Sequence, residues 1–205
     1  MQSSWELLWT PPPPPAGRAL TLEEWANLDE DEQGELVDGY LVEEEMPDPV
    51  HELAVAWLIM LFGVWLRGRG GFVMASEVKL RVGPKRGRKA DVVVYLPGSP
   101  APPRHGVLTK APDILVEIVT PTPRDVRRDR VDKMREYESI GVRYYWLLDP
   151  AIGTLEIFEL GPQGKYVRAV AQTEGSIDPV PGCPGLTLNI DELWSELERL
   201  APEPG

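Results

Sequence analysis

The chain has 205 residues, a mass of 22.9 kDa and a formal net charge of -12. Apolar residues make up 42%, which is enough to build a buried core and excludes a chain that is disordered as a whole. A single cysteine, Cys183, excludes an internal disulfide framework and a zinc site built from cysteines.

The predicted elements begin after an N-terminal arm. The arm holds two tryptophans followed by five prolines at 11–15, which impose a polyproline II conformation. Thr21 and Glu24 then form a capping box, which predicts the start of a short helix. We therefore expect three parts: an arm at 1–20, one domain at 21–200 and a tail at 201–205.

A hairpin and a long helix come next. Asp38 and Gly39 predict a tight turn between two strands within residues 35–42. Asp48 is followed by a proline, which favours a helix start at this point. Apolar residues then recur at helical spacing, and glycines at 68 and 70 predict the end of the helix.

Strands dominate the sequence from residue 72 onward. The basic, glycine-containing stretch 83–89 is interpreted as a turn, and the proline-rich stretch 97–112 as a loop. The strand at 114–119 is expected to be central, because it is apolar on both faces. The other expected strands are 72–76, 78–82, 91–95, 144–148, 154–160 and 165–171.

Two further helices complete the expected fold. One begins at Thr122 and Pro123 and stops at Gly141, and the other is capped by Asn189 and covers 190–200. The strand–helix–strand order at 113–148 predicts a parallel pair of strands joined by a crossover. The predicted fold class is therefore α/β, with antiparallel additions.

Charge is distributed unevenly along the chain. Residues 1–60 hold 14 acids and one base, residues 61–150 hold 17 bases and 10 acids, and residues 151–205 hold nine acids and three bases. A basic middle between acidic flanks could meet an anionic substrate at one face, or its bases could simply solvate the surface. The 15 arginines against six lysines, with only two asparagines, are typical of a thermophile, although GC-rich coding produces the same bias.

Nothing in the sequence predicts membrane insertion or secretion. No uninterrupted apolar run reaches the roughly 18 residues of a membrane span. The N-terminus also lacks a basic segment followed by an apolar run, so no signal peptide is visible. We expect a cytoplasmic protein with no membrane partner.

Glu117 breaks the pattern of its own strand, because apolar residues precede and follow it. Burying a carboxylate in such a strand is costly unless it is paired or binds a metal. Positions that break local rules tend to be functional sites. The alternatives are a half-exposed edge position or a pair with an arginine.

Asp91 begins the preceding strand, where an acid alone would be unremarkable. Two carboxylates on neighbouring strands, however, can converge on one hard cation such as Mg²⁺ or Mn²⁺, which prefers oxygen ligands and keeps several waters. Such an ion activates a water and neutralises charge on a phosphate. A lysine nearby would orient that water or stabilise the oxyanion. Phosphodiester hydrolysis needs an arrangement of this kind.

The spacing of Asp91 and Glu117 resembles the core of the PD-(D/E)xK nucleases. The wider sequence, over about residues 21–190, resembles the Uma-two family of restriction-endonuclease-like proteins. This resemblance implies a mixed sheet flanked by helices, with Asp91, Glu117 and the backbone carbonyl of Ile118 as metal ligands. The segments that carry it are Glu35-Leu-Val-Asp-Gly39, His51, Ala90-Asp91-Val-Val-Val, Pro112-Asp-Ile-Leu-Val-Glu117-Ile-Val-Thr-Pro121, Lys133-Met-Arg-Glu-Tyr137 and Gly141-Val-Arg-Tyr-Tyr-Trp-Leu-Leu-Asp149-Pro150.

The sequence departs from the parent motif at its lysine. That lysine would fall at Val119, which cannot orient water or stabilise charge. In the resembling family the role moves to the following helix, where Lys133 matches. Asp125, Asp129 and Lys133 are spaced four apart on one helical stripe. An ion pair with Asp129 is the alternative for Lys133, and Lys79 is the competing lysine.

Glu35 and His51 are lesser candidates. The resemblance places Glu35 in an early acidic motif, where it could support the ligands or hold a second metal; the alternative is a surface acid. His51 lies one turn into its helix, where packing or capping is the alternative to catalysis.

These features together predict a metal-dependent endonuclease acting on DNA. Six of the 21 bases lie in 79–89 and six in 124–135, on either side of the two acids in the sequence, as phosphate contacts would require. A homodimer is expected, since duplex cutting often uses two sites and the arm offers apolar contacts. One alternative is a binding or assembly protein without turnover, which Val119 favours. The other is a hydrolase of small phosphodiesters, which the acidic flanks favour.

Overall fold

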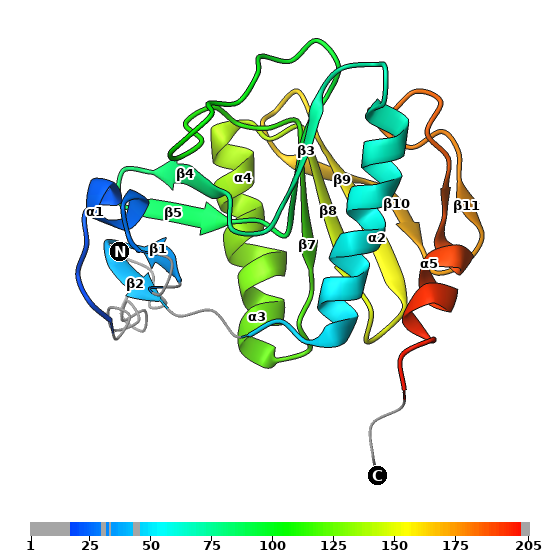
Figure 1. Cartoon of the computed structure of the whole chain (residues 1–205), viewed down its shortest axis with the longest axis horizontal. Coiled ribbons are helices and arrows are strands. Elements are labelled where there is room, and N and C mark those ends of the chain that lie inside the picture. Colours follow the sequence, from blue (N-terminus) through cyan, green and yellow to red (C-terminus); the bar gives the residue numbers. More distant parts are fainter. Residues whose placement is uncertain (1–16, 30–31, 33, 43–45, 202–205) are drawn as a thin grey trace, which may run out of the picture.

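Two β-sheets lie beside each other in the computed structural model of the chain (Figure 1). The structure describes residues 17–29, 32, 34–42 and 46–201, with only the backbone of Pro123 and Asp125. Most of the predicted arm, and all of the predicted tail except residue 201, lie outside the described residues. The predicted division into arm, domain and tail therefore stays a prediction.

The larger sheet has six strands in the order β10-β9-β8-β7-β6-β3. Strand β7 is flanked on both sides and runs parallel to β8, whereas the other neighbours are antiparallel. The predictions of a central strand, a parallel pair and a mixed α/β fold are confirmed. The strands are β3 (Phe72–Ala75), β6 (Val92–Tyr95), β7 (Ile114–Ile118), β8 (Tyr144–Asp149), β9 (Thr154–Leu160) and β10 (Tyr166–Gln172).

The smaller sheet has four strands in the order β2-β1-β5-β4, and one of them corrects the sequence analysis. Residues 83–89 were expected to form a turn, but only the hairpin connection turns and Arg86–Lys89 is strand β5. The arginines of β5 are held by carboxylates from other elements, and Gly87 packs under Trp25. These long-range contacts leave no local pattern. The other strands are β1 (Glu35–Val37), β2 (Tyr40–Val42) and β4 (Lys79–Gly83).

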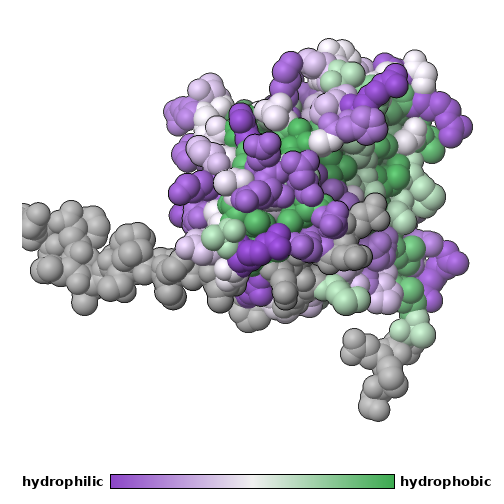
Figure 2. All heavy atoms as spheres, turned by 60° about the vertical axis from the view of Figure 1, so that its left-hand side comes forward, coloured by the Kyte–Doolittle hydropathy of each residue, from purple (hydrophilic) through white to green (hydrophobic). Residues whose placement is uncertain are grey.

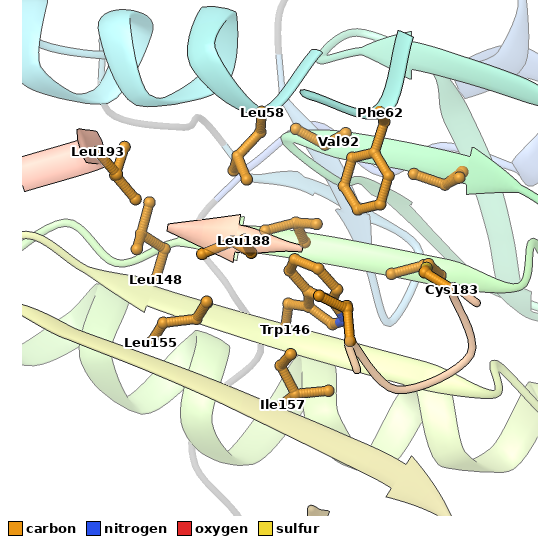
Figure 3. Packing of buried hydrophobic residues seen from close by; sticks show 14 of the residues in the cluster. Leu58, Phe62, Val92, Trp146, Leu148, Leu155, Ile157, Cys183, Leu188 and Leu193 are labelled. Atoms are coloured by element: carbon orange, nitrogen blue, oxygen red, sulfur yellow. The ribbon is translucent and has the colours of Figure 1, made fainter. Parts of the chain in front are cut away.

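Helices cover both faces of the large sheet (Figure 1). Helices α2 (Pro49–Leu66) and α5 (Ile190–Leu197) pack on one face, where Leu58 and Phe62 meet Trp146 and Leu148 (Figure 3). Segments α3 (Pro123–Arg127), η1 (Arg128–Lys133) and α4 (Met134–Ile140) pack on the other face. Alternate residues of β6 and β7 enter the two cores, as the pleat of a strand requires.

The predicted helix starts are confirmed, but the last helix, predicted over 190–200, ends at Leu197 and is followed by a turn. Helix α1 (Leu22–Ala26) has the Thr21 capping box, and α2 begins with Asp48 as N-cap and Pro49 in the first turn. Gly141 ends α4 in the left-handed conformation, and Asn189 caps α5. The two-strand sheet formed by β11 (Ser176–Ile177) and β12 (Leu188–Asn189) was not predicted.

The helix predicted from Thr122 to Gly141 contains a π-helical middle, η1. A π-helical turn widens the helix and often occurs at functional positions. It buries the side chains of Asp129 and Lys133 against the sheet. The side chain of Asp125, the third member of the predicted stripe, lies outside the described residues.

Helix α2 is long and apolar enough to cross a membrane by length and composition alone, with a mean hydropathy of 1.7 over Pro49–Leu66. Its buried residues, however, form part of the core against the large sheet. We therefore assign α2 as a core helix of this fold.

Candidate active site

Strands β6 and β7 position the two acids that the sequence analysis singled out. Val92 pairs with Val116 in antiparallel register. Continuing this register by one residue places Asp91 opposite Glu117, on the same face of the sheet. Both side chains line one cavity of about 80 Å³. Its walls are formed by Pro47, His51, Glu52, Ser76, Glu77, Lys89, Asp91, Glu117, Ile118, Thr120, Arg128, Asp129 and Lys133.

Glu117 is 1% exposed, and both of its carboxylate oxygens have donors. Lys133 Nζ donates to Oε2 over 2.8 Å, and the Tyr137 hydroxyl donates to Oε1 over 2.6 Å. Burial raises the pKa of Glu117 well above its usual value; Lys133 counteracts this shift, and the negative charge of Asp91 adds to it. Neither a half-exposed edge position nor an arginine pair describes this residue.

Lys133 reaches the cavity from η1 and lies between three carboxylates. Besides Glu117, its Nζ is 3.4 Å from Oε1 of Glu35 and 3.7 Å from Oδ1 of Asp129. Burial by itself lowers the pKa of Lys133, but these carboxylates outweigh it and keep the pKa above its usual value. The pair with Asp129 exists, yet it is the longest of the three contacts.

Glu35 supports the site from the small sheet, where it is 2% exposed. Its carboxylate accepts from Nη1 of Arg88 over 2.5 Å and from the Lys89 backbone N–H over 3.1 Å. Burial acts to raise the pKa of Glu35, but the charges of Lys133 and Arg88 lower it to about 2. Arg88 also donates to both oxygens of Glu136, so the small sheet is tied to α4.

Asp91 is held from two sides. The backbone N–H of Ile118 donates to its Oδ2 over 2.7 Å, and Nε2 of His51 lies 3.1 Å from its Oδ1. Burial lowers the pKa of His51, but the hydrogen bond and the charge of Asp91 outweigh that effect and raise it to about 9. His51 therefore holds Asp91 rather than only packing inside the helix.

Lys79, the competing lysine, does not line this cavity. Its Nζ donates to the backbone oxygens of Trp25 (2.8 Å) and Ala26 (3.3 Å) at the end of α1. It also lies over the Trp25 ring, 5.4 Å from the centroid. The lysine in contact with Glu117 is Lys133.

Sequence reasoning missed three residues at the site. Tyr137, interpreted as core, is buried but also binds Glu117; its position four residues after Lys133 was the available signal. Lys89 and Arg128 line the cavity. Lys89 also binds Glu77 over 2.6 Å, and its location in a strand could not be read once 83–89 was interpreted as a turn.

Several basic residues of 79–89 form ion pairs inside the protein. They are therefore not all available for the phosphate contacts that the sequence predicted. Arg86 binds Asp38 and Glu136, and Arg88 is buried. Arg81 and Lys85 are exposed. Figure 2, in which the left-hand side of Figure 1 comes forward, shows hydrophilic residues over much of that face with hydrophobic surface between them.

The donor set around the cavity fits a divalent ion. Each carboxylate oxygen has two lone pairs, so the hydrogen bonds of Glu117 leave coordination capacity. A cation would also relieve the repulsion between the buried Glu117 and Asp91. Within the described part of the chain, no three His, Cys, Asp or Glu side chains converge as a metal cluster. Peptide oxygens and waters would therefore complete the coordination, as Mg²⁺ commonly allows.

Comparisons with known proteins agree with this fold. The model of a family described as "Uma2: Putative restriction endonuclease" matches residues 20–191. The crystal structure of a putative nuclease belonging to DUF820 from Anabaena variabilis ATCC 29413 aligns with a TM-score of 0.67 at 22% identity. That alignment covers 87% of this chain and 99% of the other, so the two chains share a fold.

Two other comparisons add little. The type IIG restriction endonuclease BpuSI aligns with a TM-score of 0.35 and 18% identity, over 76% of this chain and 17% of that enzyme. No curated protein matches the sequence.

Proposed function

Because the chain belongs to the Uma2 family, described as putative restriction endonucleases, we propose that it is a metal-dependent endonuclease that hydrolyses DNA phosphodiester bonds. Family and fold support a nuclease at the coarse level, and the site supports the finer assignment. One observation carries it: Asp91 and Glu117 line one cavity, and Lys133 donates to Glu117 over 2.8 Å.

Asp91, Glu117 and the backbone oxygen of Ile118 would hold Mg²⁺ or Mn²⁺ in this cavity. The ion, when bound, supplies a water of lowered pKa and neutralises charge on the phosphate. Glu117 is fixed by Tyr137 and Lys133, and Asp91 by His51 and the Ile118 peptide, so both carboxylates are oriented before a substrate enters. Such preorganisation is the main source of electrostatic stabilisation in enzymes.

Lys133 takes the role of the lysine missing at position 119. Val119 is buried in the core and carries no charge, whereas Lys133 approaches Glu117 from η1. Its ammonium has three donors, so it can hold Glu117 and still donate to an attacking water or a phosphate oxygen. Glu35 lies 3.4 Å from the same ammonium and positions it without touching the substrate.

DNA is the proposed substrate, because cationic residues border the cavity. Lys89 and Arg128 line the cavity. Arg124 and Arg127, in the preceding segment α3, are exposed. Phosphate contacts of this kind give affinity without sequence readout. We propose that two copies act together on a duplex, each cutting one strand, in the cytoplasm.

A cleavage assay tests the proposal. Plasmid, single-stranded DNA and RNA are incubated with the protein and Mg²⁺, Mn²⁺ or a chelator. We expect nicking or linearisation of the plasmid that a chelator stops and that Asp91→Asn and Glu117→Gln each abolish. Asp113→Asn is the matched control, because Asp113 lies outside the cavity and accepts hydrogen bonds from the Ser99 hydroxyl and from a backbone N–H.

The same assay separates the alternatives. DNA binding without cutting, unchanged in both site variants, would identify a binding protein that keeps the fold without turnover. Cleavage confined to a small substrate such as bis-p-nitrophenyl phosphate would identify a hydrolase of small phosphodiesters. Either result contradicts the endonuclease proposal.

A further inference from the structure

One face of helix α2 is apolar and exposed, and of its residues only Glu52, at the N-terminal end, also lines the candidate active site. Ala56, Met60 and Val64 are spaced four residues apart along the exposed side, where Met60 is 60% and Val64 is 68% exposed. Between Glu52 and Arg67 the helix contains no charged residue. Exposed apolar residues gathered on one side of a helix indicate a binding face.

A wide groove runs along this face. It has a volume of about 680 Å³ and is formed by the exposed side of α2 together with residues 185–187. Trp57, Leu61 and Trp65 contribute half-buried or buried apolar walls. The groove therefore offers aromatic and aliphatic contacts of the type found at the centre of protein interfaces.

Opposite charges mark the two ends of the α2 face. Glu52, whose side chain is 56% exposed, lies at the N-terminal end, and Arg67 and Arg69 lie at the C-terminal end. In the described part of the chain Arg67 makes no ion pair, and Arg69 lies over the Trp65 ring instead of binding a carboxylate. An antiparallel copy of the same helix would complement both ends.

We propose that the α2 face is the interface of a two-fold symmetric dimer, with the two helices antiparallel and crossing at Met60. In this register, positions whose numbers sum to 120 face each other, so Glu52 of each copy meets Arg67 and Arg69 of the other. A parallel pairing would set Glu52 against Glu52, which repels. Symmetric self-complementarity is what a two-fold interface requires.

A membrane is the other occupant to consider, since α2 is apolar and long enough to span one. Helices that lie on membranes carry a polar face rich in Lys and Arg. The opposite face of α2 is instead buried in the core, and the protein has a net charge of -12, which anionic lipids repel. A second copy fits these observations better.

The dimer has a consequence for the placement of the two cavities. Each cavity includes His51 at the N-terminal end of α2. In the proposed register, position 51 of one copy faces position 69 of the other. The two cavities then lie at opposite ends of the helix pair, about 27 Å apart along the axis. Dimer formation does not require catalysis. The dimer proposal can therefore be contradicted while the nuclease proposal stands, and the reverse is also true.

Mass measurement by light scattering after gel filtration gives the first test. We expect a mass of twice 22.9 kDa for the full chain at micromolar concentration. The double variant Met60→Glu with Val64→Glu should be a monomer with an unchanged circular-dichroism spectrum. Ile152→Glu, at a position that is 64% exposed in a loop, is the matched control and should remain a dimer.

Cysteine cross-linking tests the register. The native Cys183 is buried and should not compete. Met60→Cys should give a disulfide-linked dimer under mild oxidation. Val64→Cys should not cross-link alone, because its two copies lie about 12 Å apart along the axis, but should do so when combined with Ala56→Cys.

Three results would overturn the proposal. One is a wild-type monomer at 100 µM, and another is a dimer that persists in the Met60→Glu, Val64→Glu variant. The third is flotation of monomeric wild-type protein with phosphatidylcholine–phosphatidylglycerol vesicles, which would assign the face to a membrane.

Discussion

Lys133 Nζ lies 2.8 Å from Oε2 of Glu117, and both residues are at most 2% exposed although they come from different elements. Neither charge could be buried alone at acceptable cost. The contact joins the central strand of the large sheet to the π-helical segment. Because Lys133 also contacts Glu35, it links the candidate metal ligands to the small sheet.

Replacing Lys133 should remove most of the activity while leaving metal binding. We expect Lys133→Met to lower DNA cleavage by about 10²–10³-fold, because the transition state loses its cationic donor. Lys79→Met, which removes a lysine that caps α1, should retain activity within a few-fold. Initial rates under single-turnover conditions measure both. Equal losses in the two variants would mean that Lys133 has no special role.

Tyr137 should act through the orientation of Glu117. Tyr137→Phe removes the hydroxyl that donates to Oε1, and we expect a loss of about 1–2 kcal/mol in the free energy of unfolding together with slower cleavage. Tyr166→Phe is the control, since it loses a comparable hydrogen bond to the Val142 backbone oxygen away from the cavity. It should lose stability but keep its cleavage rate. If both variants cleave alike, Tyr137 is only a core residue.

Glu35 should cause the free energy of unfolding to decrease as the pH becomes acidic. Its pKa is lowered to about 2 in the folded state against 4.5 for an ordinary glutamate, so the unfolded state binds more protons as the pH falls. The stability that the Glu35 anion contributes is full above pH 4.5 and is lost as the pH falls toward 2.

Denaturant unfolding of wild type and Glu35→Gln at several pH values checks this. Wild type should be more stable by roughly 3 kcal/mol at pH 6, and the difference should shrink steadily between pH 4.5 and the lowest accessible pH. A difference that does not change with pH would show that Glu35 contributes only packing.

Gly87 should tolerate no side chain, because an added Cβ would lie 2.3 Å from the Trp25 ring. Gly87→Ala must displace Trp25, whose side chain is fully buried, so we expect a loss of about 1–3 kcal/mol. At Gly83, in the neighbouring strand, the nearest atom would lie at 3.6 Å, and Gly83→Ala should change stability by less than about 1 kcal/mol. Thermal melts of the two variants measure this difference, and equal melting temperatures would contradict the prediction.

The sequence predicted the central part of the fold well, because local signals and tertiary structure agree there. Capping residues marked α1, α2 and α5, and an apolar run marked β7. Glu117 was found because a carboxylate in that run had no local explanation. The pairing of Asp91 with Glu117 followed from the order of the strands.

The small sheet could not be predicted in the same way. Strand β5 consists of Arg86, Gly87, Arg88 and Lys89, which have low strand propensity or need partners when buried. Those partners, Glu35 and Glu136, lie about 50 positions away in the chain, so no local pattern reports them. Lys89 was missed for the same reason. The π-helical turn that buries Lys133 likewise leaves no periodic signal.

The most direct test of the central claim is titration of Mn²⁺ into the apoprotein, followed by calorimetry or by the electron paramagnetic resonance signal of free Mn²⁺. We expect one site per chain in wild type and in Asp113→Asn, and its loss in both Asp91→Asn and Glu117→Gln. If Mn²⁺ binds these two variants as tightly as wild type, or does not bind wild type at all, Asp91 and Glu117 do not form a metal site.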